Sequence, residues 1–296
     1  MKTKSNILIL GASGFIGQHI VKHLANSSWK VYAQCLPNET PSSLPDVIWL
    51  PCDLRNANCV QTWPEKCDSI IYLAQSPEWR VFPDGAKDVF EVNVAAVIRT
   101  IEYARNVEAQ HFIFASSGSV YDQTTQPSRE DDRFDIGAQR NFYAASKLAT
   151  ELLIKPYTSL MSIINLRLFS PYGLGLNPKM LISQLVHRVQ ERKAIDLHGK
   201  DGMQINPVAV ADVTRVLERC LTLENSATFN VAGPDRLTLR RVSEIIGLTV
   251  GIAPQFTAHP EQRVPVLVGD TTALLKQLGW APQIPFETGI RAWLES

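Results

Sequence analysis

The sequence predicts an α/β fold in which helices cover both faces of a doubly wound parallel sheet. Two observations carry this prediction. Short apolar runs with the composition of buried strands alternate with longer stretches of helical periodicity over the first half of the chain. The first of these strands also leads through a glycine-rich turn directly into a helix, as the first half of a strand-helix-strand unit requires.

The composition is that of an ordinary globular protein. The 296 residues are 45% hydrophobic, and 29 basic side chains balance 29 acidic ones. This balance gives no reason to expect nucleic acid or a membrane surface as a partner. No stretch resembles a signal peptide or reaches membrane-spanning length, so we expect a cytoplasmic protein. The five cysteines are odd in number and contain no Cys-x-x-Cys pair, and we interpret them as reduced packing residues.

The predicted strands are short apolar runs, and the first, over residues 6–10, precedes a helix that begins near Phe15. Further strands are expected at residues 31–33, 47–50, 70–73, 112–114 and 163–166. Helices are expected at residues 88–105 and 141–154. In such a sheet the ligand lies beyond the carboxyl ends of the strands, which is where Asp53, Ala74 and Ser117 fall.

The glycine turn contains Gly11, Gly14 and Gly17, spaced three residues apart. Backbone N–H groups and the positive end of the helix dipole would face an anion there, and any larger side chain would keep the anion away. The turn therefore suits the pyrophosphate of a dinucleotide. The other residues of this segment that are expected to contact the dinucleotide are Ser13, Phe15 and Ile16. The spacing differs from the usual Gly-x-Gly-x-x-Gly fingerprint, so the glycines alone do not specify a cofactor.

The pattern loosens from about Leu176 onward, where scattered short apolar runs separate helices. These helices are expected at residues 178–192, 240–247, 273–278 and 287–294. We therefore predict a dinucleotide-binding domain over residues 1–175 and a smaller α+β substrate-binding lobe over residues 176–296. No linker separates them, so the two are expected to interleave.

Tyr143 and Lys147 lie four residues apart in a helical stretch, so their side chains emerge on one face. A free tyrosine titrates near 10, and a fixed positive charge beside it would let the phenol exchange a proton at neutral pH. Ser117 ends a buried strand, where its hydroxyl could share a hydrogen bond with the substrate oxygen. The same Tyr-x-x-x-Lys spacing also arises by chance on amphipathic helices.

Together the glycine spacing, Ser117, Tyr143 and Lys147 resemble the short-chain dehydrogenase/reductase superfamily. Within it the chain resembles the extended branch, the NAD-dependent epimerase/dehydratase family that modifies nucleotide sugars. The resemblance implies a Rossmann-like sheet and a bound nicotinamide cofactor. It also implies that Ser117 orients the substrate, that Tyr143 is the acid/base, and that Lys147 tunes Tyr143 and holds the cofactor ribose.

The resemblance runs along nearly the whole chain. Asp53 and Leu54 match the segment that contacts adenine, although Asp53 could equally cap the next helix. Pro171 lies in a segment that resembles the one along the nicotinamide, and Asn93 matches a buried structural asparagine. The cofactor-binding residues implied are Gly11, Ser13, Gly14, Phe15, Ile16, Gly17, Asp53, Leu54, Ala74, Tyr143, Lys147 and Pro171.

The chain departs from the family at the end of the second strand. Cys35 stands where an NAD-dependent member usually has an aspartate for the adenosine ribose, and no arginine replaces it. Glu39 is the first acid afterwards, and we expect it to be solvated. The loss of a carboxylate removes repulsion against a 2′-phosphate, which favours NADP(H) or dual use slightly over NAD alone. Gly118 and Ser119 replace the acidic pair of sugar dehydratases, which argues against dehydration.

The leading functional prediction is hydride transfer at C4 of a nucleotide-activated sugar. A 4-keto sugar reductase is narrowly favoured, because the missing aspartate would weaken the grip on a permanently bound cofactor. A 4-epimerase with bound NAD is the main alternative. A reductase of a non-nucleotide carbonyl shares the same catalytic set. A non-catalytic dinucleotide-binding homologue is disfavoured because it would not need an activated phenol.

Substrate contacts are expected from Ser117 and Ser119, and from Asn177 and Arg263 in the second lobe, with a turn before Pro178 as the rival role of Asn177. We expect no metal site, because no carboxylate accompanies the paired histidines of the first helix. The resemblance implies a homodimer, which would pair through residues 88–105 and 141–154.

Overall fold

The computed structural model describes residues 4–25, 27–39, 41, 43–122, 125–135, 137–138, 140–259, 264 and 266–295. It divides into two compact units, of which the first comprises residues 1–120, 137–167 and 217–228 and the second comprises residues 121–136, 168–216 and 229–296. No helix in the described part of the chain is long and apolar enough to span a membrane.

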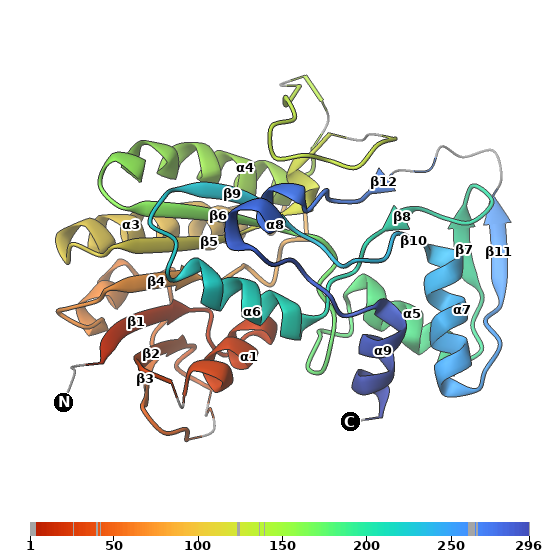
Figure 1. The fold of residues 1–296 in the computed structure, drawn as a ribbon, viewed down its shortest axis with the longest axis horizontal. Helices are drawn as coiled ribbons and strands as arrows, with labels where there is room; N and C mark the ends of the chain where they lie inside the picture. Colours follow the sequence, from red (N-terminus) through yellow and green to blue (C-terminus); the bar gives the residue numbers. More distant parts are fainter. Residues whose placement is uncertain are drawn as a thin grey trace. The chain divides into compact units, whose positions relative to one another are not determined.

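A seven-stranded parallel sheet confirms the predicted fold class (Figure 1). Its strand order is β3-β2-β1-β4-β5-β6-β9, so the chain winds outward from β1 in one direction and then from β4 in the other. The strands are β1 (Ser5–Leu10), β2 (Trp29–Cys35), β3 (Val47–Pro51), β4 (Ser69–Tyr72), β5 (His111–Ser117), β6 (Ser162–Leu168) and β9 (Ala227–Val231). The central strands are buried on both faces, which explains their nearly continuous apolar sequences.

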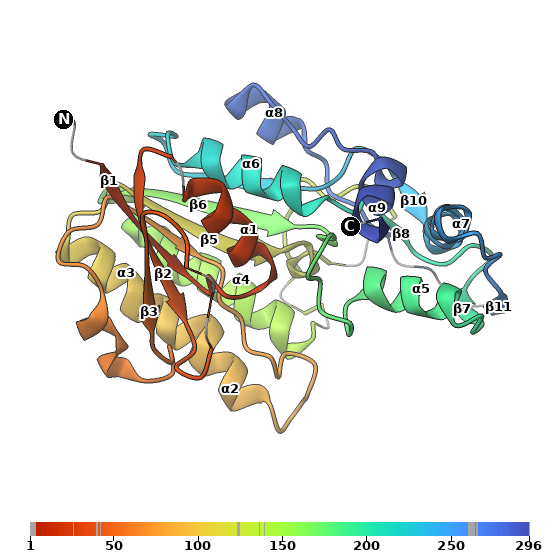
Figure 2. The ribbon, with the colours of Figure 1, turned by 90° about the horizontal axis from the view of Figure 1, so that it is seen from below.

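Helices cover both faces of this sheet (Figure 2). One face carries α1 (Phe15–Leu24), and the opposite face carries α3 (Ala96–Asn106) and α4 (Phe142–Ile154). Asn141 fixes the start of α4, because its side chain accepts a hydrogen bond from the backbone N–H of Ala144 at 2.8 Å. This cap places Tyr143 and Lys147 in the first turns of the helix.

The helix that ends in α3 changes from α-helix to π-helix and back along its length. It begins as α2 (Ala86–Phe90), widens into the π-helical segment η2 (Glu91–Ala95) and then continues as α3. Asn93 lies inside the widened turn and is fully buried, as predicted. Its side chain accepts from the backbone N–H of Ser76 and donates to the Ser146 hydroxyl, both at 3.2 Å. The widened turn therefore joins the loop after β4 to α4.

The remaining short elements of the first unit are the 3-10 helices η1 (Ala57–Thr62), η3 (Gly118–Val120) and η4 (Lys155–Ser159). They lie in connections at which the sequence has no helical periodicity. The residues that contribute to the core between the sheet and α3 include Leu8, Ile70, Phe112, Val97 and Ile101.

The second unit is built from short strands and helices. One small sheet has the order β10-β8-β12, and a second pairs β11 with β7. The strands are β7 (Ile195–His198), β8 (Gln204–Ile205), β10 (Leu237–Thr238), β11 (Phe256–His259) and β12 (Val266–Leu267). The helices, which confirm the four expected after Leu176, are α5 (Leu181–Gln190), α7 (Leu239–Val250), α8 (Thr272–Leu278) and α9 (Phe286–Leu294). A further helix, α6 (Val210–Cys220), precedes β9.

The interpretation of all five cysteines as reduced is wrong for one pair. Cys52 and Cys59 form a disulfide that closes the loop after β3, with their Cα atoms 5.7 Å apart. The pairing depends on the tight fold of η1, which brings back a residue seven positions along the chain. Cys35, Cys67 and Cys220 are free and buried, as expected of packing residues.

Candidate active site

The glycine turn between β1 and α1 has no room for a side chain at Gly11 or Gly17. Gly11 has φ +78°, and a Cβ atom on it would lie 2.6 Å from the backbone nitrogen of Ala74. A Cβ atom on Gly17 would lie 2.2 Å from the carbonyl oxygen of Gly11. The backbone of the turn, the start of α1 and the end of β4 are therefore packed directly together.

The turn of Gly11, Gly14 and Gly17, called the cradle below, fits the pyrophosphate of a dinucleotide. The N-terminus of α1 has no side-chain cap, so its first backbone N–H groups are available to an anion. Ala74 and Leu54 are buried at the same edge of the sheet, at the ends of β4 and β3. Ser13, Phe15 and Ile16 are half-buried around the turn. When bound, NAD would supply the hydride acceptor or donor of a redox reaction.

Gly17→Ala is expected to damage both the turn and dinucleotide binding. The new Cβ atom would overlap the Gly11 carbonyl, so we expect a loss of about 2 kcal/mol in the free energy of unfolding and of most NAD affinity. Thermal denaturation and calorimetric titration measure the two effects. Gly14→Ala is the matched control for stability, because its Cβ atom would lie 3.2 Å from the same oxygen. Equal stability of Gly17→Ala and wild type would contradict the steric argument.

The predicted catalytic residues come together within the first unit. Ser117 ends β5, and Tyr143 and Lys147 lie one helical turn apart on α4. Ser117 lies close enough to Tyr143 to lower the pKa of its phenol, against the effect of burial. The Ser117 oxygen accepts a hydrogen bond from the backbone N–H of Ser119 at 3.1 Å, which helps to fix the position of the hydroxyl.

Lys147 is almost completely buried. Its Nζ atom donates to the carbonyl oxygen of Ala115 at 2.8 Å and lies 4.8 Å from the ring centroid of Phe114. Burial lowers the pKa of Lys147 to about 7, and the charge of Glu151 opposes that shift. Burial raises the pKa of Tyr143, and the hydrogen bond from Ser117 opposes it. In this setting the charge on Lys147 is sensitive to pH near neutrality.

A buried ion pair lies one turn beyond Lys147. Glu151 and Arg167 are 6% and 5% exposed, and the Arg167 Nη2 atom lies 2.7 Å from the Glu151 carboxylate. The same carboxylate accepts a short hydrogen bond from Ser116, the neighbour of Ser117. The pair therefore ties α4 to the ends of β5 and β6. Glu151 was not predicted as part of the site, although Tyr143, Lys147 and Glu151 follow one another at intervals of four.

Arg167→Met is expected to lower the free energy of unfolding by about 3 to 5 kcal/mol, because it leaves the Glu151 carboxylate buried without its partner. Denaturant unfolding measures the loss. Arg291→Met is the matched control, because Arg291 and its partner Glu287 are both more than half exposed. A loss no larger than that of the control would show that the buried pair does not fix α4.

Trp79 is a second residue that the sequence analysis missed. Its ring centroid lies 5.1 Å from that of Tyr143, and the guanidinium of Arg80 lies 4.2 Å from the ring of Trp79. The loop that carries Trp79 is held by a short hydrogen bond from Ser76 to Asp88. No pattern in the sequence marks this contact, since it depends on how the loop folds back.

Asp53 binds Arg55 rather than capping a helix. Its carboxylate accepts hydrogen bonds from Nε and Nη2 of Arg55 at 3.0 and 2.6 Å. The following helix η1 is capped by Asn56, whose side chain accepts from the backbone N–H of Asn58. The capping alternative for Asp53 is therefore wrong, and its contact with adenine stays a prediction.

The candidate residues of the second unit are described only in part. Asn177 forms the turn before α5, since its side chain accepts from the backbone N–H of Lys179 at 2.9 Å. Its contact with a nucleotide, like that of Pro171 with a nicotinamide, stays a prediction. Arg263 lies outside the described residues.

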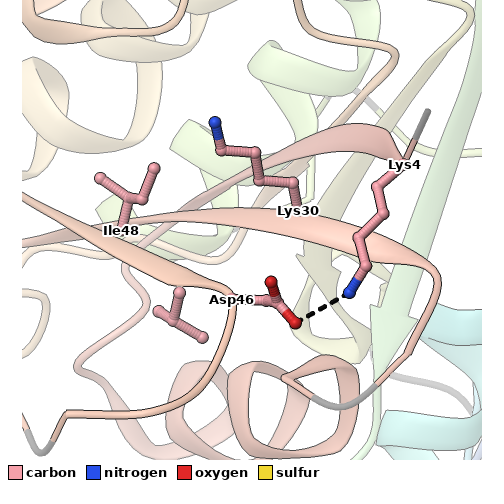
Figure 3. A pocket seen from close by; sticks show the side chains of 5 residues that line it. Lys4, Lys30, Asp46 and Ile48 are labelled. Atoms are coloured by element: carbon pink, nitrogen blue, oxygen red, sulfur yellow. Dashed lines mark hydrogen bonds and ion pairs between the residues drawn. The ribbon is translucent and has the colours of Figure 1, made fainter. Parts of the chain in front are cut away.

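A hollow in the first unit lies at the wrong edge of the sheet for a cofactor (Figure 3). It is lined by Lys4, Lys30, Asp46, Val47 and Ile48, with an ion pair of 2.8 Å between Lys4 and Asp46. These residues stand at the amino ends of the first three strands, whereas ligands of such sheets lie at the carboxyl ends.

The paired histidines of α1 have other partners. The ring of His19 packs edge-on against Phe15, and the Nε2 atom of His23 lies 2.9 Å from the carboxylate of Glu218. Glu218, in α6, therefore brings a carboxylate to His23 that the sequence of the first helix does not contain. Within the described ranges, no group of three histidine, cysteine or acidic side chains could hold a metal ion.

The chain matches one protein family over most of its length. The model of the NAD dependent epimerase/dehydratase family matches residues 7–232. The chain is 26% identical to the GDP-6-deoxy-D-mannose reductase of Pseudomonas aeruginosa, across 97% of this chain and 95% of the relative. It is 23% identical to the UDP-glucuronate 4-epimerase of Thermodesulfobacterium geofontis, across 96% and 93%.

Among solved structures, MoeE5 in complex with UDP-glucose and NAD superposes with a TM-score of 0.83 at 25% identity and covers 98% of each chain. This protein therefore belongs to the NAD-dependent epimerase/dehydratase family and is an enzyme of the extended short-chain dehydrogenase/reductase kind.

Proposed function

We propose that this enzyme transfers a hydride at C4 of a nucleotide-activated sugar. One observation carries the proposal: the buried Lys147 lies one helical turn from Tyr143 and donates to the Ala115 carbonyl of β5, the strand that Ser117 ends. The side-chain-free cradle of Gly11 and Gly17 lies at the same edge of the same sheet. The relatives, which include nucleotide-sugar reductases and 4-epimerases, support this class of substrate.

Each residue has a distinct role in this proposal. Tyr143 gives a proton to the C4 oxygen in reduction and takes it back in oxidation. Ser117 shares a hydrogen bond with that oxygen and orients it. Lys147, when charged, stabilises the phenolate and makes proton transfer possible near neutral pH. Trp79 packs against the phenol ring and keeps water from that side of it.

Reduction of a 4-keto sugar is the first candidate reaction. At the end of β2 the residue at the usual aspartate position, Cys35, is 1% exposed and carries no charge that could hold a permanently bound cofactor. Two of the relatives are reductases of nucleotide-linked deoxysugars. An NAD(P)-dependent reductase must exchange its cofactor after each turnover, which suits a weaker grip.

A 4-epimerase is the second candidate, because solved neighbours of this fold hold NAD together with UDP-sugars. A reductase of a non-nucleotide carbonyl would use the same three residues and remains a further alternative. A non-catalytic dinucleotide-binding homologue would have no use for a phenol one helical turn from a buried lysine.

The substrate nucleotide is assigned to the second unit from sequence alone, with Asn177 and Arg263 as its proposed contacts and Ser119 beside the sugar. We also propose a homodimer that pairs through α3 and α4. Its support is the exposure of large apolar side chains on and beside these helices, since Phe90 is 50% exposed and Leu152 62%. The cytoplasmic location stays a prediction.

Denaturing the purified enzyme and identifying the released nucleotide separates the two candidates. An empty protein that reduces 4-keto nucleotide sugars when given a reduced cofactor would support the reductase. Stoichiometric NAD released from the protein would instead support the 4-epimerase, because that reaction regenerates its own cofactor in each cycle.

A further inference from the structure

The end of β2 and the glycine turn are joined by hydrogen bonds. β1 and β2 pair in parallel, with Ile9 opposite Ala33. Just beyond, the backbone N–H of Ala12 donates to the Gln34 carbonyl at 3.0 Å, and the N–H of Gly11 donates to the Gln34 side-chain oxygen at 2.8 Å. A group fixed at the end of β2 is therefore also fixed relative to the cradle.

Neither residue at the end of β2 can bind a sugar hydroxyl. Cys35 is 1% exposed. Gln34 is 3% exposed, and its amide is occupied on both sides: the oxygen by Gly11 and the nitrogen by the Cys52 carbonyl at 2.6 Å. The position that holds the adenosine ribose in dinucleotide-binding sheets must therefore take its polar group from elsewhere.

A turn directly after β2 brings the carboxylate of Glu39 back to the end of this strand. The backbone N–H of Glu39 donates to the Leu36 carbonyl at 3.0 Å, which closes a turn directly after Cys35. Within this turn the Glu39 Oε2 atom accepts from the backbone N–H of Leu36, also at 3.0 Å. The side chain is exposed, as expected, but it is folded back against the strand end.

Two further observations concern the negative charge of Glu39 at the end of β2. Burial and then the negative charge of Glu39 raise the pKa of the Cys35 thiol, as expected if the carboxylate stands close to it. Among the residues that the structure describes, none donates to the second oxygen, Oε1. One oxygen of Glu39 is thus anchored to the backbone directly after β2.

We propose that Glu39 replaces the missing aspartate, binds the adenosine ribose hydroxyls and makes the enzyme selective for NAD over NADP. The proposal rests on the dinucleotide site of the proposed function. A carboxylate accepts hydrogen bonds from both ribose hydroxyls, whereas it repels a 2′-phosphate at the same place. It reverses the slight preference for NADP(H) that Cys35 alone suggested, and it removes the missing aspartate as a reason to favour a reductase over a 4-epimerase.

The test is calorimetric titration of the full-length enzyme with NAD and, separately, with NADP. We expect wild type to bind NAD at least about tenfold more tightly than NADP, and Glu39→Gln to bind NAD about tenfold more weakly without losing affinity for NADP. Glu65→Gln is the matched control, because Glu65 is an exposed glutamate at the amino side of β4. It should bind both cofactors as wild type does.

Equal affinity of wild type for NAD and NADP, or an unchanged NAD affinity in Glu39→Gln, would overturn the proposal. Neither titration contains a sugar, so failure on Glu39 is distinct from failure of the proposed reaction. A wild-type protein that binds neither cofactor would overturn both, and its circular dichroism spectrum would show whether it had folded.

Discussion

Tyr143→Phe is expected to lower the turnover number by about 10³-fold while it changes the NAD dissociation constant less than twofold. The substitution removes only the phenolic oxygen, which we propose exchanges a proton with the sugar. The ring that packs against Trp79 remains, so the shape of the site is kept. Steady-state kinetics and cofactor titration on the same preparation check both parts.

Tyr157→Phe is the matched control for this change. Tyr157 lies in η4, and its hydroxyl donates to Glu102, away from the candidate site. Tyr157→Phe also loses a phenolic oxygen, and this variant should keep wild-type turnover. If Tyr143→Phe retained turnover within tenfold of wild type, Tyr143 would not be the acid/base and the mechanism would be wrong.

Lys147→Met has the second-largest expected effect, a loss of about 10²- to 10³-fold in turnover. The methionine fills the buried space but cannot stabilise the phenolate of Tyr143. It also cannot reach the cofactor ribose, so NAD binding should weaken about tenfold. Lys155→Met, an exposed lysine just beyond the end of α4, should behave as wild type.

Lys147 also predicts the pH dependence of keto reduction. Its pKa is lowered by burial to about 7, so its charge is present below that pH and is lost above it. The pKa of Tyr143 is raised by burial, so the phenol stays protonated over the same range. The value of kcat/KM for reduction should therefore fall as pH rises through about 7. A profile that rose through this range would contradict the assignment.

The sheet could be predicted from the sequence because its strands are local and apolar. The runs at residues 6–10, 70–73 and 112–114 have few polar positions, as strands buried on both faces require. The glycine turn then fixed the connection from β1 to α1. Boundaries were less accurate: α5 begins at Leu181 rather than near Pro178, because Asn177 makes a turn first.

The catalytic set was predictable because its spacing is a property of one helix. Tyr143 and Lys147 need only an α-helix to share a face, whereas the partners of this pair depend on tertiary structure. Glu151 and Arg167 meet across the end of β6, and Trp79 reaches Tyr143 from a loop. Nothing in the local sequence determines those distances.

Glu39 and the disulfide illustrate the same limit on a smaller scale. Both follow from turns that bring a residue back by three to seven positions, and the turns themselves have weak sequence signals. From sequence, Glu39 is an acid in a proline-flanked loop. In the structure its carboxylate accepts a hydrogen bond at the end of β2, which changes the predicted cofactor preference.

Hydride transfer at C4 is the central claim, and isotope transfer tests it most directly. The enzyme, first freed of any bound nucleotide, would be given reduced cofactor in which both hydrogens at C4 of the nicotinamide are deuterium, together with a set of 4-keto nucleotide sugars. Both candidate reactions include this step, so the account predicts deuterium at C4 of the sugar product with wild type and none with Tyr143→Phe. Cofactor that binds but leaves its deuterium on the nicotinamide with every such sugar would contradict the account.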